Sequence, residues 1–181
     1  MSAHTVAVRY ANALLMIAVE KGTVEQTRTA LRVFADRMME SAEFRIVLES
    51  PVIDLPQRHA VIRAVAEKGG MSADVRNFLL LLADRKRLAV VPQIAEHLDR
   101  LADDHLGILR ARVDTPLAMT ESQKATLRTL LEKKYGRKVQ LSERLDESIL
   151  GGFRLVVGNT VMDATLDARL ARLRETIVNE L

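Results

Sequence analysis

Apolar residues recur every three to four positions through roughly the first hundred residues, a spacing that places them on one face of a helix. The pattern predicts six helices before residue 106, and each boundary falls at residues that cap or stop helices. The predicted starts are at Ser41, Asp54 and Ser72, and the predicted ends or breaks are at Lys21-Gly22, Ser50-Pro51, Gly69-Gly70 and Asp84–Leu88.

After Gly107 the period of the pattern changes to two, which is typical of half-buried strands. Two strands are expected around a helix that opens with the capping box Thr120/Gln123 and closes at Gly136. A β-hairpin follows, with Gly158-Asn159 as its two-residue turn. A last helix carries apolar residues at heptad-like spacing, and we expect them in the core of this region. These residues are Leu166, Leu170, Leu173 and Ile177.

The change of period predicts a mainly α protein with two regions: a six-helix bundle over 1–105 and a small α+β module over 106–181. Apolar residues make up 48% of the chain but aromatic residues only 3%, so Ala, Leu and Val must supply the core, a composition that favours helices. The longest apolar run, Ala13–Val19, is far shorter than a membrane-spanning helix. The start of the chain resembles neither a signal peptide nor a transit peptide.

Nothing in the sequence predicts a catalytic, metal or cofactor site. The chain has no Cys, which excludes disulfides, thiolate metal sites and cysteine nucleophiles. His97 and His105 lie two turns apart without a carboxylate in a metal-binding pattern, and no GxSxG motif occurs. Gly151, Gly152 and Gly158 have the wrong spacing for a phosphate loop, so we expect them to serve backbone geometry.

The net charge of +3 lies entirely in residues 106–181, which hold 13 basic and 10 acidic side chains. Because of this bias, nucleic-acid binding is an alternative function, carried out by a basic α+β module with a helical partner domain. The clusters Arg85-Lys86-Arg87 and Lys133–Lys138 would be its basic patches. Single-strand binders also need aromatic stacking platforms, and Tyr135 and Phe153 are the only aromatics of the module. Solvated faces therefore explain both clusters better.

Two segments carry more apolar residues than one core-facing stripe requires. Ala13–Val19 and Phe78–Ala83 are apolar all the way around their helices. Either both helices are central in the bundle, or together they expose a groove for a partner helix. The residue pattern alone does not choose between these arrangements.

Three segments, taken in order, resemble the δ subunit of F-type ATP synthases, called OSCP in mitochondria. Val8–Leu14 is similar to the family's VARRYAKAL opening, and Arg76–Asp84 to its fifth-helix segment. Leu150–Leu173 resembles the C-terminal signature IGGxxxxxGDxxxDxSxxxxLxxL. The residues of that signature are Gly151, Gly152, Gly158, Asp163, Leu166, Leu170 and Leu173. Asn159 and Arg85-Lys86 depart from the family pattern, and neither change touches a catalytic residue.

The resemblance implies a non-catalytic stator, or peripheral-stalk, protein without cofactor, nucleic acid or small-molecule substrate. Its N-terminal bundle would bind the N-terminal helix of an ATP synthase α subunit on the F1 head, and its C-terminal module would bind the membrane-anchored b subunits. The head would thereby be held still while the rotor turns. With no transit peptide predicted, we expect a bacterial form at the cytoplasmic face of the inner membrane, touching the membrane only through the complex.

The groove for the α-subunit helix is expected between the first and fifth helices. On the fifth helix, the stripe from Val75 to Leu82 is assigned to the core, which leaves Asn77, Leu81 and Asp84 on another face. On the first helix, Leu15 is assigned to the core together with three alanines. The residues then left on the partner side are Tyr10, Ala13, Leu14 and Ile17.

Overall fold

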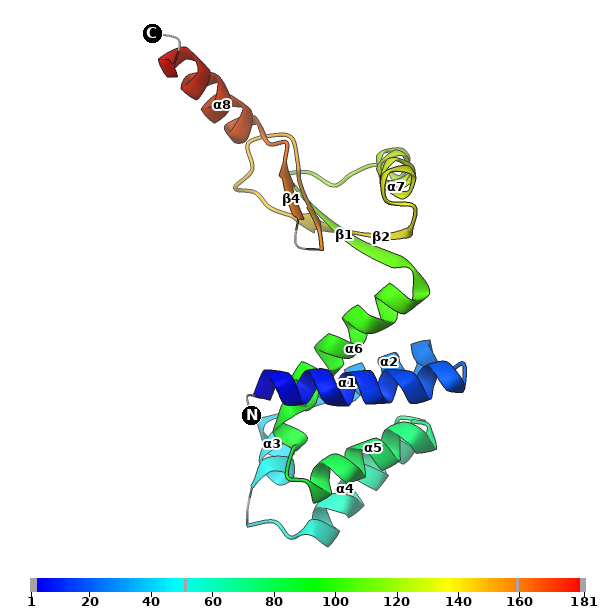
Figure 1. Cartoon of the computed structure of the whole chain (residues 1–181). Coiled ribbons are helices and arrows are strands. Elements are labelled where there is room, and N and C mark those ends of the chain that lie inside the picture. Colours follow the sequence, from blue (N-terminus) through cyan, green and yellow to red (C-terminus); the bar gives the residue numbers. More distant parts are fainter. Residues whose placement is uncertain (1–2, 51, 159, 180–181) are drawn as a thin grey trace. The chain divides into compact units, whose positions relative to one another are not determined.

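The computed structural model describes residues 3–50, 52–158 and 160–179 (Figure 1). The chain forms two compact units, 1–102 and 103–181. The sequence-based boundary at 105/106 lies three residues later, inside the last turn of a helix. Most of the described chain is helical, and the strands all belong to the second unit. No helix in the described part combines the length and apolar character needed to cross a membrane.

The first unit is built from helices whose ends were mostly predicted correctly. They are α1 (Ala3–Glu20), α2 (Val24–Glu40), α3 (Ala42–Glu49), α4 (Leu55–Lys68), α5 (Ala73–Asp84), the 3-10 turn η1 (Leu88–Val90) and α6 (Val91–Leu106). The side chains of Ser41, Asp54 and Ser72 each accept a hydrogen bond from the backbone N–H three residues ahead. These bonds satisfy N–H groups that the first turn of a helix leaves free, which confirms all three predicted N-caps.

Large aliphatic and aromatic side chains from α2 to α6 form the core of this unit. Its fully buried members include Leu31, Phe34, Ile62, Leu79, Leu82, Ile94 and Leu98. α1 contributes smaller groups, Ala7 and Ala11, together with Leu14. Leu14 is 1% exposed, so the assignment of Leu14 to the partner side is wrong. Leu14 and Leu15 fit the helical period nearly equally well, and it is Leu15 that lies half-buried at the edge.

The second unit is a four-stranded sheet with a helix packed on it. Its elements are β1 (Ile108–Thr115), α7 (Glu121–Tyr135), β2 (Lys138–Leu145), β3 (Arg154–Val157), β4 (Thr160–Asp163) and α8 (Leu166–Asn179). The sheet order is β2-β1-β3-β4. β1 and β2 run parallel with α7 as their crossover. β3 lies between β1 and β4 and pairs antiparallel with both. The Thr120/Gln123 capping box opens α7 as predicted.

Alternation along the strands places one face of the sheet against α7. Ala111, Val113, Val139 and Leu155 are buried there with Leu131 of α7. The β3–β4 register pairs Val157 with Thr160, which confirms the two-residue hairpin turn. Gly158 has φ +56° in that turn, as its predicted role requires. The other turn residue, Asn159, lies outside the described residues.

The α8 leucines differ from their predicted burial. Leu166 is 48% and Leu170 62% exposed, so the prediction that they form the core of the module is wrong for this chain by itself. Strand residues and α7 already fill the interior, and α8 begins at the edge of the sheet just after β4. The side chains of Leu173 and Ile177 lie outside the described residues.

Candidate partner-binding face

α1 and α5 meet along a seam that two contacts define (Figure 1). The rings of Tyr10 and Phe78 pack edge to face with centroids 6.1 Å apart. Eleven residues further along the chain, Lys21 Nζ lies 2.6 Å from Asp74 Oδ1. The N-terminal half of α1 therefore lies beside the later residues of α5, and the end of α1 beside the start of α5.

Exposed apolar side chains flank this seam from both helices. Ile17 of α1 is 42% exposed and Leu81 of α5 is 44% exposed. Ala13 and Asn77 are also exposed, whereas Tyr10 is half-buried against Phe78. We call the set Tyr10, Ala13, Ile17, Asn77 and Leu81 the α1–α5 face. Five of the six residues that the sequence assigned to the groove are thus exposed or half-buried on these two helices, whereas Leu14 is removed from the set.

The opposite flank of α1 carries a contact that the sequence did not reveal. His4 Nδ1 and His97 Nε2 of α6 are 3.3 Å apart, and the two rings pack edge to face at 4.8 Å. Burial lowers the pKa of His97 below its usual 6.5, and His4 and Arg100 lower it further, against a raising effect of Glu96. His4 and His97 are 93 residues apart in the sequence, so spacing alone gave no signal for this pair.

The histidine pair should make the stability of the first unit pH-dependent. Because the folded state lowers the pKa of His97, the unfolded chain binds more protons between that pKa and 6.5, and stability falls as pH drops through this window. We expect His4→Gln to raise the pKa of His97 and to flatten the pH dependence of the melting temperature below pH 6.5. NMR titration of the imidazoles measures the first effect and thermal unfolding the second. His105→Gln, at an exposed position of α6, is the control; equal His97 titrations in the His4 variant and the wild type would contradict the expectation.

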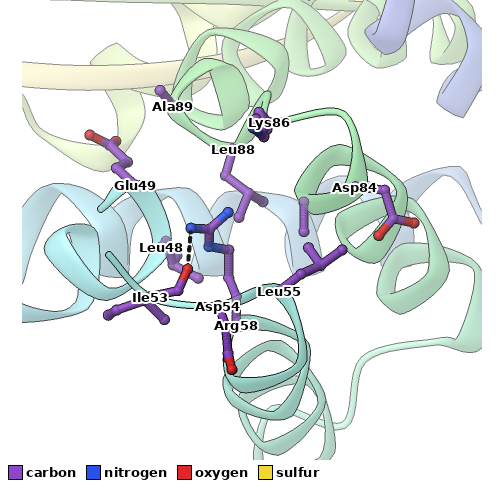
Figure 2. Close-up of a pocket in the computed structure, with 11 residues that line it drawn as sticks. Leu48, Glu49, Ile53, Asp54, Leu55, Arg58, Asp84, Lys86, Leu88 and Ala89 are labelled. Atoms are coloured by element: carbon purple, nitrogen blue, oxygen red, sulfur yellow. Dashed lines mark hydrogen bonds between the residues drawn. The ribbon is translucent and has the colours of Figure 1, made fainter. Parts of the chain in front are cut away.

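A separate pocket of about 370 Å³ lies where α4, α5 and η1 approach the segment joining α3 to α4 (Figure 2). Arg58 occupies its centre, 8% exposed, and donates to the backbone oxygens of Ser50 and Ile53 at 2.8 and 3.0 Å. These bonds hold the α3–α4 connection against α4. Around the pocket, Asp84 is engaged by His59 at 2.9 Å. Both bonds come from Nη2, and the buried Nε of Arg58 has no hydrogen-bond partner among the described residues. The pocket is therefore explained as structural, built around a buried cation that ties down the preceding connection.

The second unit presents a second apolar surface, made of Leu150, Leu166 and Leu170. All three are exposed. The Leu166 N–H donates to the Gly151 oxygen at 2.9 Å, which places the start of α8 beside the segment that carries Leu150. Leu166 and Leu170 are one helical turn apart and so share a face of α8. Among the described residues, no cluster of three or more metal-binding side chains accompanies either surface.

Comparisons with known proteins agree over nearly the whole chain. The family model described as ATP synthase delta (OSCP) subunit matches residues 6–177. A protein named ATP synthase subunit delta from Anaeromyxobacter dehalogenans is 37% identical over 173 residues, covering 96% of this chain and 97% of its own length. Proteins of the same name from Geotalea uraniireducens and Nitratidesulfovibrio vulgaris are 33% and 35% identical, each with 98% of both chains covered.

A solved structure shows a similar fold. A chain in the cryo-EM structure of the Toxoplasma gondii mitochondrial ATP synthase hexamer aligns with a TM-score of 0.70 and 23% sequence identity. The alignment covers 95% of this chain and 97% of the other chain. The fold of this chain therefore also occurs in a chain of that assembly.

Proposed function

Because the chain belongs to the ATP synthase delta (OSCP) subunit family, we propose that it links the α3β3 head of an ATP synthase to the membrane-anchored b subunits. It is a non-catalytic subunit of the peripheral stalk. Held in this way, the head stays still while the rotor turns, so that torque drives ATP synthesis instead of spinning the head. The family match over residues 6–177 carries this proposal, and it favours a stalk subunit over a nucleic-acid-binding module.

The α1–α5 face is the site we assign to the N-terminal helix of an α subunit. Its apolar centre, Ala13, Ile17 and Leu81, is exposed in the free chain and comes from two neighbouring helices. An amphipathic helix laid between them would bury these side chains with its own apolar stripe. The six helices of the first unit would then act as one bundle that supports the docked helix.

The second unit is the site we assign to the b subunits. Leu150, Leu166 and Leu170 give it an exposed apolar surface that is separate from the packed side of the sheet. The bacterial relatives support placing the protein at the cytoplasmic face of a bacterial inner membrane, attached through its complex.

Reconstitution tests both halves of the proposal. Purified full-length chain, added to membranes that retain b subunits and to F1 that lacks this subunit, should restore F1 binding and ATP-driven proton pumping. Leu170→Asp should abolish co-sedimentation with the b-containing membranes because a carboxylate would be buried without a partner. Leu130→Asp, at a similarly exposed position on α7, is the matched control. Pumping that needs no added chain would refute the function, and normal co-sedimentation of Leu170→Asp would refute the b-contact surface.

A further inference from the structure

The α1–α5 face ends in an arginine on each helix. Arg9, Ala13 and Ile17 follow one another at intervals of four residues along α1. Asn77, Leu81 and Arg85 do the same along α5, and the Arg85 N–H donates to the Leu81 oxygen at 3.1 Å, which continues the helical turn. Residues four apart share a helix face, so Arg9 lies one turn from Ala13 on α1 and Arg85 one turn from Leu81 on α5.

Both arginines lie at the same end of the face. Tyr10 packs on Phe78 and Lys21 pairs with Asp74, so the two helices run in opposite directions along the seam. Arg9 precedes Tyr10 by one residue, and Arg85, the C-cap of α5, follows Phe78 by seven, so both lie on the Tyr10–Phe78 side of the seam, away from the Lys21–Asp74 pair. The other end holds the Lys21–Asp74 pair and the uncharged Asn77, together with the exposed carboxylate of Glu20.

These two guanidinium groups are exposed and make no ion pair within the described part of the chain. Of the other nine arginines in residues 1–102, four are engaged within the described part of the chain. Arg28 and Arg32 pair with acidic residues of α2 and α6, Arg100 pairs with Glu96, and Arg58 binds backbone oxygens. Two exposed donors on the same side of the face, without an acidic partner in the described part of the chain, favour a carboxylate supplied from outside, since guanidinium and carboxylate groups form strong charge-assisted hydrogen bonds.

We propose that Arg9 and Arg85 form a charge clamp that selects a docking helix with acidic side chains at one end, one turn beyond its apolar anchors. This inference rests on the proposed function, which makes the N-terminal segment of an α subunit the occupant of the face. The apolar centre supplies contact area, whereas the clamp fixes which end of the helix meets α5's C-terminus. A helix docked in the reverse direction would place its acidic end on the Lys21–Asp74 pair and leave both arginines without a partner.

Calorimetry with the full-length chain tests the clamp, using as probe a synthetic peptide of the α-subunit N-terminal segment encoded with this chain. The double variant Arg9→Glu/Arg85→Glu should bind roughly tenfold more weakly at low salt. The loss should shrink at about 1 M salt, where charges are screened within ~3 Å. The matched control, Arg37→Glu/Arg63→Glu, makes the same change in net charge at two exposed positions away from the face and should bind normally.

Alanine replacement of the acidic residues at one end of the peptide should lower its affinity for the wild-type chain by the same factor. The double variant should then bind this altered peptide as strongly as the wild-type chain does. Leu81→Asp separates this inference from the proposed function. If Leu81→Asp abolishes binding but the double variant matches its control, the clamp is refuted and the docking face stands. If Leu81→Asp also binds normally, the α1–α5 face itself is refuted, and the clamp with it. Circular dichroism of each variant verifies that the bundle is folded.

Discussion

Replacing Leu81 by Asp should weaken binding of the α-subunit N-terminal segment about a hundredfold or more and leave the melting temperature nearly unchanged. Burying a Leu side chain contributes about 1.5–3 kcal/mol, and the introduced carboxylate would lose its water without gaining a partner. A tenfold change in affinity corresponds to about 1.4 kcal/mol, so the two effects together reach two decades. Leu81 is 44% exposed in the free chain, and the folded bundle therefore tolerates the charge.

Two further substitutions make the Leu81 result specific. Val33→Asp changes a similarly exposed apolar residue on α2 and should leave binding unaffected. Leu14→Asp places a carboxylate in the core and should unfold the first unit, because Leu14 is fully buried. Calorimetry gives the affinities and thermal unfolding the stabilities. Normal binding by folded Leu81→Asp, or unfolding caused by it, would show that the face has been misassigned.

Replacing Gly152 by Ala should destabilise the second unit by roughly 3 kcal/mol or more. Gly152 has φ +84°, and a Cβ atom there would lie 2.4 Å from the Ala164 oxygen and 3.0 Å from the Thr165 Cα. Both atoms belong to the backbone between β4 and α8, so no side-chain rotation relieves the clash. Moving the segment apart would break the bonds from Leu166 N–H to Gly151 oxygen and from Ala164 N–H to Phe153 oxygen.

Gly158→Ala is the matched control for this loss. Gly158 also has a positive φ, +56°, but a Cβ atom there would have open space around it. Its replacement should cost only about 1 kcal/mol, the penalty for an L side chain in the left-handed region. Chemical denaturation of the two variants gives the difference directly. If the two variants lost equal stability, the close approach of the Ala164–Thr165 backbone would not explain the glycine at position 152.

The close approach at Gly152 illustrates what the sequence could predict. Adjacent glycines before a strand-like segment indicated either a bend in the strand or the close approach of another backbone, and the second is what the structure has at Gly152. The caps Ser41, Asp54 and Ser72 were predictable because the N-cap side chain bonds a backbone group within its own first turn. Strand boundaries followed from the alternation of apolar and polar residues.

Features that depend on distant residues escaped prediction. Arg58 is buried because loop oxygens from the preceding connection reach it, and nothing in a hydrophobic pattern distinguishes it from a solvated arginine. Leu14 and Leu15 differ by one helical step, and only the packed bundle decides which points inward. Leu166 and Leu170 have the spacing of a core stripe, which is also the spacing of a stripe that binds a partner helix.

The alanines in the core of α1 have a consequence for how the first unit opens. α1 buries only one large side chain in this core, Leu14, beside Ala7 and Ala11, so it gains less hydrophobic stabilisation than α2, which buries Leu31, Phe34 and Met38. In the free chain, α1 should therefore belong to the first cooperative unit to open in hydrogen exchange. A partner helix bound on α1 and α5 raises the free energy of that opening. The increase depends on the affinity and the concentration of the partner helix. Occupancy would thus be readable as slowed amide exchange along α1, and the folded state would be stabilised against global unfolding by the same free energy.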